Sequence, residues 1–403
     1  MAKFEQLPDV TIESIIAFAN LFDLKFLMNL NSVSKKFRHF MDSFLSSLTD
    51  KIFQRHYSLL HYNYPRSYLN LYHQLVFPSI IIIGGYQDSR RCDIFFPANQ
   101  KYAKCCGLSL KRTDDFSATY HKGLIFVISS SEVSAVGTVE VFDFIKNRWE
   151  SLPALPSNVK NAASLSHNGI LYVIGGYDLN LSKTSSNIFI LNEGVFESKQ
   201  LTKVETWMST DHSLLFGRSH HAAISFDNCI WIAGGIILGQ NVSTNSTEIY
   251  SPELKLSKNG PSMQRTRYLP HLLTLKSLDK VGDIWDLYVV GGDIRGTTRE
   301  LGTIERLDRK TQEWVIVTTF PRRRFKCAVC AIGDHVICLI GGSDGAERLK
   351  SCDCYDIRSG QWSTFFCGSQ DYSSIFGRVN GMESSVAVPI TPPRLSVDLL
   401  LGH

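Results

Sequence analysis

Short apolar runs that end in two glycines recur along most of the chain. A clear copy is Ile170-Leu171-Tyr172-Val173-Ile174, followed by Gly175-Gly176. Similar runs precede the glycine pairs at 84–85, 234–235, 291–292 and 341–342, and a degenerate copy over 124–128 ends in two serines. Such runs predict buried β-strands, and the glycines predict a tight turn or a positive φ at each strand end. We therefore expect one β-unit to occur six times, at steps of 45 to 59 residues.

A second pattern follows several of these units. A strand-like segment ends in an aromatic residue or leucine, and a tryptophan stands seven positions later. The clearest pairs are Phe142 with Trp149, Leu307 with Trp314, and Tyr355 with Trp362. Large apolar side chains at a fixed spacing are suited to packing between neighbouring units. Because one unit cannot bury both of its faces alone, we expect the units to close into a ring.

These units resemble the kelch family, whose repeat of roughly 50 residues forms one four-stranded blade of a β-propeller. The resemblance implies an all-β, six-bladed kelch-type β-propeller over residues 77–390. The run before Gly84-Gly85 has no inner strand ahead of it, whereas 382–388 near the C-terminus resembles an inner strand with no glycine pair after it. This C-terminal strand is expected to complete blade 1 and close the ring. Pro389 and the prolines after it are expected to end the strand, and 391–403 to form a tail.

The N-terminal part has a different pattern. Apolar residues recur at helical spacing after Leu7-Pro8-Asp9, and a helical bundle of this size has more apolar side chains than it can bury. Residues 1–44 resemble an all-α F-box, with Ser34 and Phe37 in place of the family's usual Cys and Trp, and 45–76 are expected to form a helical linker. The resemblance implies that the F-box binds a Skp-type adaptor through Leu7, Pro8, Ile15, Ile16, Leu30, Val33 and Phe37.

The two resemblances together imply a substrate-recognition subunit of a Skp–cullin–F-box E3 ubiquitin ligase. In such a complex the propeller would bind a protein target, and the chain itself would catalyse nothing. A non-catalytic kelch scaffold without a ligase role is the alternative. Some kelch-type propellers are copper oxidases, but no set of tyrosines and histidines for a copper site can be placed in this chain. We therefore expect no cofactor.

Composition and charge narrow the choice of partners and compartment. The net charge of +4 is too small to indicate nucleic-acid binding, and no apolar run is long enough to span a membrane. The first residues contain no signal-peptide pattern, which predicts a cytoplasmic or nuclear protein. A strand would place Cys327 and Cys330 on opposite faces and Cys352 and Cys354 on one face, so we expect core cysteines and no structural zinc.

Basic residues stand at comparable positions before several expected inner strands: Arg218, Arg267, Arg324 and Arg378, with Lys160 as a weaker fifth. They are expected to converge at one mouth of the central channel, where guanidiniums would suit an acidic or phosphorylated segment. Alternatively, each arginine ties adjacent blades together.

Other parts of the expected propeller are also open to more than one interpretation. The run Arg322-Arg323-Arg324-Phe325-Lys326 is interpreted as a solvated loop, an anion- or peptide-binding site, or a localisation signal. Two long segments, 197–217 with Trp207 and Met208, and 276–286, are either binding loops or variable ones.

Overall fold

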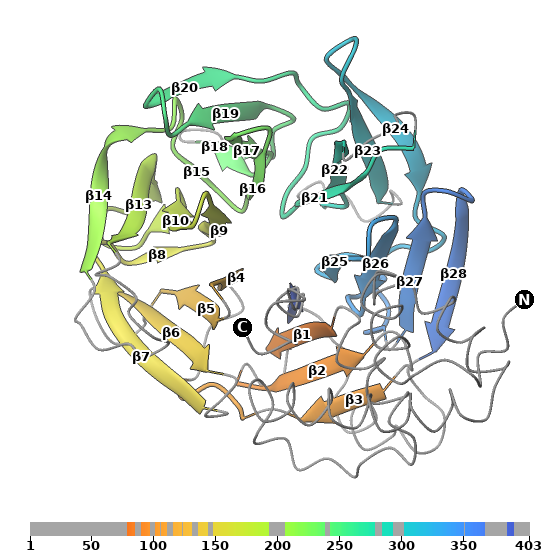
Figure 1. Ribbon diagram of the computed structural model, residues 1–403, viewed down its shortest axis with the longest axis horizontal. Coiled ribbons are helices and arrows are strands. Elements are labelled where there is room, and N and C mark those ends of the chain that lie inside the picture. The colour runs from red at the N-terminus through yellow and green to blue at the C-terminus, as the bar shows by residue number, and fades with distance from the viewer. Residues whose placement is uncertain are drawn as a thin grey trace, which may run out of the picture.

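The computed structural model contains six four-stranded antiparallel sheets that stand as blades around a ring (Figure 1). This strand-rich arrangement fits the expected β-propeller. The structure describes residues 79–84, 90–96, 101–104, 106–110, 116–122, 124–130, 136–143, 148–192, 206–237, 242–278, 284–292, 302–349, 351–366 and 385–390. The expected F-box with its seven adaptor-binding residues, the linker, Arg378 and the C-terminal tail lie outside the described residues.

Blades 1 to 3 each extend through four strands from the inside of the ring outward. Blade 1 consists of β29 (Ser385–Ile390), β1 (Ser79–Gly84), β2 (Cys92–Phe96) and β3 (Lys101–Lys104). Blade 2 consists of β4 (Ser117–His121), β5 (Leu124–Ser129), β6 (Gly137–Asp143) and β7 (Arg148–Leu155). Blade 3 consists of β9 (Ala163–His167), β10 (Ile170–Ile174), β13 (Asn187–Asn192) and β14 (Thr206–Ser213).

Blades 4 to 6 follow the same order. Blade 4 consists of β16 (Ala222–Phe226), β17 (Cys229–Ala233), β19 (Thr247–Ser251) and β20 (Leu256–Asn259). Blade 5 consists of β21 (His271–Lys276), β22 (Trp285–Val290), β23 (Thr303–Asp308) and β24 (Glu313–Thr319). Blade 6 consists of β25 (Ala328–Ile332), β26 (Val336–Ile340), β27 (Ser351–Asp356) and β28 (Gln361–Phe366).

Two small sheets stand beside blades 3 and 4. One pairs β8 (Val159–Lys160), β11 (Tyr177–Asp178) and β12 (Lys183–Thr184), and the other pairs β15 (Arg218–Ser219) with β18 (Ile236–Ile237). Each contains the segment that leads into its blade's inner strand.

The glycine pairs end the second strand of a blade, as the sequence predicted. Gly235, for example, has a φ of 85°, and a Cβ atom added to it would lie 2.3 Å from the carbonyl oxygen of Ser219. Only glycine combines this left-handed conformation with such a close backbone approach. The pair thus lets the chain turn sharply beside the segment that enters the inner strand.

Each of the apolar core clusters takes side chains from two adjacent blades. Trp314 of blade 5 packs among side chains of blade 4, such as Trp231, and is 1 % exposed. The ring centroids of Phe142 and Trp149 lie 5.1 Å apart in a cluster that blade 1 shares. These contacts confirm the prediction that the aromatic–tryptophan pairs pack between blades.

The ring closes through the C-terminal strand. Strand β29 pairs antiparallel with β1, from Ser79 opposite Ile390 to Gly84 opposite Ser385, and it lies against β25 of blade 6 and β4 of blade 2. This pairing confirms the expected closing strand. The prediction that Pro389 ends the strand is wrong, because Pro389 lies within β29 opposite Ile80. Among the described residues β29 pairs only with β1, and such an edge position tolerates a residue without an amide hydrogen.

The interpretation of 197–217 as one long loop is also wrong in part. Residues Thr206–Ser213 form β14, and Trp207 lies opposite Leu191 in the register that Trp149 has with Phe142. Trp207 is 7 % exposed, and its indole Nε1 donates a hydrogen bond of 3.1 Å to the carbonyl of Pro153. An insertion between Leu191 and Trp207 makes the distance between them longer than the usual seven positions. The sequence pattern therefore did not identify Trp207 as the tryptophan of this blade. Similarly, Lys276 and Trp285 belong to strands at the two ends of the expected 276–286 loop.

Candidate functional site

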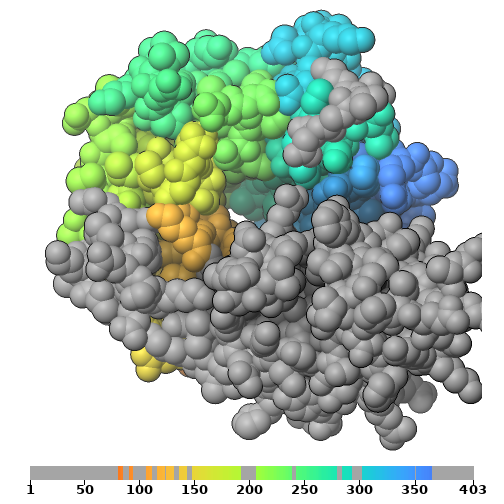
Figure 2. Space-filling model, viewed as in Figure 1, coloured from red at the N-terminus to blue at the C-terminus, as the bar shows by residue number. Residues whose placement is uncertain are grey.

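The ring has two rims that differ in their connections. One rim contains the glycine pairs, the turns that follow them, and the segments that lead from one blade into the next, such as 214–221, 260–270 and 320–327. We call it the glycine rim. The opposite rim contains the hairpins between first and second strands and between third and fourth strands. Figure 2 shows one face of the ring, with a hollow at its centre that several blades border.

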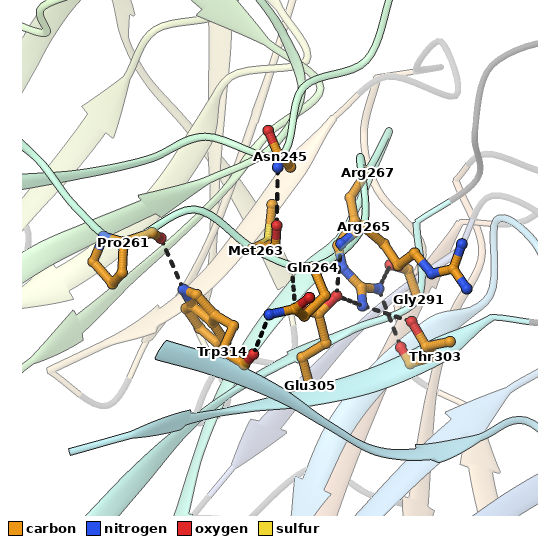
Figure 3. Close-up of polar contacts among 10 residues, drawn as sticks. All are labelled: Asn245, Pro261, Met263, Gln264, Arg265, Arg267, Gly291, Thr303, Glu305 and Trp314. Carbon is orange, nitrogen blue, oxygen red and sulfur yellow. Dashed lines mark hydrogen bonds and ion pairs between the residues drawn. The ribbon is translucent and has the colours of Figure 1, made fainter. Parts of the chain in front are cut away.

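A buried ion pair fixes the entry to blade 5 on the glycine rim (Figure 3). Arg267 is 1 % exposed, and its Nη2 donates to Glu305 Oε1 at 2.7 Å. Its Nη1 donates to the carbonyls of Thr303, at 3.1 Å, and of Gly291. The Glu305 carboxylate also accepts the backbone amides of Gln264 and Arg265, at 2.8 and 3.1 Å. One carboxylate therefore holds both the arginine and the incoming chain.

The same lock occurs in blades 4 and 6. Arg218 Nη2 donates to Glu248 Oε2 at 3.1 Å, and Glu248 Oε1 accepts the Leu215 amide at 2.6 Å. Arg324 Nη2 donates to Asp353 Oδ2 at 2.6 Å, and its Nη1 donates to the Ser351 carbonyl at 2.9 Å. Burial raises the pKa of Glu248, while the Leu215 amide and Arg218 act in the opposite direction. We name each arginine–carboxylate pair an entry lock.

The entry locks correct the expectation for the aligned arginines. Arg218, Arg267 and Arg324 are 1 to 5 % exposed and face carboxylates of their own blades. These guanidiniums are enclosed by the fold, so this placement does not favour their binding a target. Their side chains stay within one blade, but the backbones of Arg218 and Arg267 bind the preceding blade. The Arg218 amide donates to the Ser185 carbonyl at 3.0 Å, and the Arg267 amide donates to the Thr244 carbonyl at 3.0 Å. These two arginines therefore support the alternative that they tie adjacent blades together. For Arg378 the target-binding role stays a prediction.

Further backbone hydrogen bonds link successive blades at the channel mouth. The amide of His220 donates to the Asn161 carbonyl at 3.0 Å, and the amide of Leu269 donates to the His220 carbonyl at 2.9 Å. These residues stand two positions before the inner strands of blades 3, 4 and 5, and all have a positive φ of 53 to 57°. His220 also stacks on Tyr268, with centroids 4.6 Å apart. Asparagine, histidine and leucine share no feature that would reveal this role in the sequence.

Blade 3 has no acid at the position where the third strands of other blades carry one. Phe189 occupies the register position that Glu140, Glu248, Glu305 and Asp353 occupy in other blades, and it packs in an apolar cluster. Lys160, the weaker fifth basic residue, lies with its Nζ 6.0 Å from the centroid of the Tyr177 ring. The acids were not among the residues predicted from the sequence, although each stands two positions before an aromatic residue or leucine of the third strand.

The cysteines belong to the core. Cys330, Cys338, Cys352 and Cys354 share one buried cluster, whereas Cys327 belongs to another, so the predicted strand faces are confirmed. The sulfur atoms of Cys338 and Cys354 lie 3.2 Å apart. Burial raises the pKa of Cys327 to about 11, and neighbouring thiols, followed by burial, raise that of Cys338. Protonated, enclosed thiols of this kind are poor nucleophiles and poor metal ligands.

The exposed part of the glycine rim is basic in one sector and apolar in another. Arg322 and Lys326 are exposed beside the entry lock of blade 6. Leu215 and Phe216, before the entry lock of blade 4, are 45 and 46 % exposed. Across the described ranges, no group of three or more His, Cys, Asp or Glu is placed to hold a metal ion. Within the same ranges there is no helix with the length and apolarity to cross a membrane. The exposed basic and apolar side chains of the rim are available for binding.

Comparisons with known proteins agree with this architecture. Residues 217–264, 286–321 and 323–365, which fall in blades 4 to 6, match the family described as Kelch motif. Kelch-like protein 25 of Xenopus tropicalis is 25 % identical over 292 residues, or 71 % of this chain and 46 % of the relative. The human Kelch-like protein 25 is 24 % identical over 295 residues, with the same coverage. Kelch-like protein 36 of Mus musculus is 28 % identical over 238 residues, or 58 % of this chain and 35 % of the relative.

The chain spans less than half the length of each of these relatives. The alignments are much longer than the N-terminal segment, so they include a large part of the repeat region. The matched motifs, the kelch-like relatives and the ring of six four-stranded blades together support a likeness between this chain and kelch-repeat proteins.

Proposed function

We propose that this chain is a protein-interaction module that acts as the substrate-recognition subunit of a Skp–cullin–F-box E3 ubiquitin ligase. In this proposal the propeller binds the protein target, and residues 1–44 bind a Skp-type adaptor that connects the chain to a cullin. Ubiquitin transfer would be carried out by other subunits. The cytoplasm or the nucleus would be the compartment.

One observation carries the proposal: a segment with the F-box pattern precedes a kelch-repeat ring whose exposed rim is built for contact. Leu7-Pro8 and the series ending in Phe37 give the N-terminal segment its resemblance to an F-box. The apolar Leu215 and Phe216 on the glycine rim are the kind of exposed side chains that mark protein-binding surfaces. A protein with one surface for an adaptor and another for a target has the layout of a receptor subunit.

Co-purification with a Skp-type adaptor tests the proposal. Replacing Leu7 and Pro8 together by Ala is expected to weaken adaptor binding more than tenfold, since each buried apolar contact contributes roughly 1.5–3 kcal/mol. A matched control replaces Pro252 and Leu254, on the hairpin rim of blade 4, by Ala and leaves adaptor binding unchanged. Equal binding by both variants, or no binding by the unaltered chain, would contradict the ligase role and favour a kelch scaffold.

A further inference from the structure

The basic run of blade 6 is held rigidly at two points. Arg324 is enclosed and locked to Asp353. Phe325 makes a two-way backbone bridge with Ser343, with N–O distances of 2.9 and 3.0 Å. On either side of these fixed points, Arg322 and Lys326 are exposed. The backbone that carries them therefore loses little conformational freedom when they bind a partner.

Three basic side chains are displayed by this support. Arg322 and Lys326 are exposed, and Arg323 is half-buried. A Cβ added to Gly345 would lie 3.6 Å from the Arg323 guanidinium, so this group lies over a glycine. A neighbouring acid, Asp344, accepts the amides of Ala346 and Glu347, both at 2.9 Å. Both bonds go to Oδ1 and lower the pKa of the Asp344 carboxyl, and the charge of Arg322 lowers it further. Asp344 therefore offsets part of the positive charge at this place.

The equivalent positions in other blades differ. The residues two before and two after the lock arginine are Phe216 and His220 in blade 4, Arg265 and Leu269 in blade 5, and Arg322 and Lys326 in blade 6. The scaffold is shared, whereas the displayed side chains change from apolar to basic around the ring. Of the three blades with an entry lock, blade 6 has basic residues at both positions, whereas blade 5 has one, Arg265.

We propose that the glycine rim at blade 6 binds an anionic segment of a protein target, with carboxylate or phosphate oxygens held by Arg322, Arg323 and Lys326. This inference rests on the proposed function in one respect, that the propeller is the target-binding part. Guanidinium groups form paired, charge-assisted hydrogen bonds with such oxygens. A protein partner is favoured over nucleic acid because Leu215 and Phe216 on the same rim are apolar and the net charge of the chain is only +4.

The test uses the full chain and fluorescence anisotropy. The probes are a short labelled peptide of alternating glutamate and glycine, the same peptide with phosphoserine in place of glutamate, and a labelled single-stranded DNA. A variant with Arg322→Glu and Arg323→Glu is compared with a control that has Lys258→Glu and Lys310→Glu. The control makes the same charge change at exposed positions on β20 and the hairpin rim. A second rim variant, Arg322→Glu with Lys326→Glu, changes only exposed side chains.

Both rim variants are expected to bind the anionic peptides at least about tenfold more weakly than the unaltered chain, and the control by less than about twofold. The tighter of the two peptides identifies carboxylate or phosphate as the preferred group. Equal losses in rim and control variants, or no peptide binding by the unaltered chain, would overturn the inference. Tighter binding of the DNA than of either peptide would overturn it in favour of a nucleic-acid surface.

Adaptor capture by the same variants separates this inference from the proposed function. We expect capture to be unchanged in both rim variants, because the altered residues lie in the propeller. A failure of the unaltered chain to bind either peptide, with intact adaptor capture, would refute the inference alone. Intact peptide binding without any adaptor capture would refute the ligase role and leave the rim site standing.

Discussion

Blades 3 and 5 use one four-strand plan but hold their entering segments differently. In blade 5 the buried Arg267–Glu305 pair binds the segment through side chains. In blade 3 the matching position of the third strand is Phe189, and β8 holds the entering segment by pairing with β11. Both blades still take part in the backbone links at the channel mouth. The entry lock is therefore not required to build a blade.

The difference shows what the lock contributes. Removing two charges from water costs several kcal/mol per ion, so a buried pair adds little net stability over well-packed apolar groups. Once present, however, it cannot lose one partner without leaving an uncompensated charge in the interior. The lock also satisfies backbone amides and carbonyls, such as the amides of Gln264 and Arg265 and the carbonyl of Thr303 in blade 5. Blades 4 to 6 carry the locks, and these are the blades that match the Kelch motif.

Breaking the lock of blade 5 should give the largest effect. We expect Arg267→Met to lower the free energy of unfolding by about 3–5 kcal/mol, because Glu305 is left charged and unpaired. In blade 3 the position of the lock arginine is occupied by Val159, and Lys160→Met, at the neighbouring basic residue, should cost less than about 0.5 kcal/mol. Urea denaturation of both variants measures the two values.

A second change sharpens this comparison. Adding Glu305→Gln to Arg267→Met removes the buried charge, while the amide oxygen can still accept one of the two backbone amides. The double variant should therefore be more stable than Arg267→Met alone. Equal costs at Arg267 and Lys160, or no recovery in the double variant, would show that the ion pair is not what distinguishes the two blades.

Blade 4 contains a buried histidine that should contribute to the response of the protein to acid. His221 precedes the inner strand where blade 3 has Ala162, and burial, followed by the charges of Arg218 and His220, lowers its pKa to about 3 from 6.5. Between these values the unfolded chain takes up a proton that the folded chain does not. The contribution of His221 to stability is therefore complete above the unfolded pKa and declines as the pH falls, by about 1.4 kcal/mol per pH unit.

Urea unfolding at several pH values between 7 and 5 measures this slope. The variant His221→Gln should reduce this slope of unfolding free energy against pH by about 1.4 kcal/mol per pH unit, close to the contribution of one titrating group. An unchanged slope in the variant would mean that other groups control the acid response, and that His221 is not buried in its neutral form.

The smallest loss of stability is expected from a hydrogen bond that blades 3 and 5 both contain. The indole of Trp314 donates to the Pro261 carbonyl at 3.0 Å, and that of Trp207 donates to the Pro153 carbonyl at 3.1 Å. Trp314→Phe and Trp207→Phe should each cost about 1–2 kcal/mol, because each removes one hydrogen bond and leaves a carbonyl without its partner. Thermal melts of the two variants should agree closely, and a large difference would show that the outer strands are not equivalent.

Much of the fold is predictable from the sequence because its signals are local. Glycines such as Gly175 and Gly176 mark strand ends, and the spacing from Phe142 to Trp149 marks a hairpin. The closing strand follows from counting, since blade 1 lacked an inner strand and one segment near the C-terminus had no blade of its own. Local signals failed at Trp207, where an insertion hides the spacing, and at Pro389, where an edge strand accepts proline.

The candidate site is less predictable because burial depends on distant partners. The alignment of Arg218, Arg267 and Arg324 gives their position in the blade but not the direction of their side chains. That direction depends on acids that stand 29 to 38 residues later in the chain. Each acid stands two positions before an aromatic residue or leucine of the third strand, as Glu305 stands before Leu307. The two patterns taken together would have predicted buried pairs.

The pairing of β29 with β1 also has a consequence for how the protein is made. Strand β1 leaves the ribosome roughly 300 residues before β29, which at about 5–20 residues per second is a delay of roughly 15–60 s. During that time the inner edge of β1 has no partner, and an open edge of this kind can pair with another chain. Nascent chains on one polysome lie close together, so aggregation through the unpaired β1 edge is expected mainly among them. Slower translation would lengthen the time for which this edge stays unpaired.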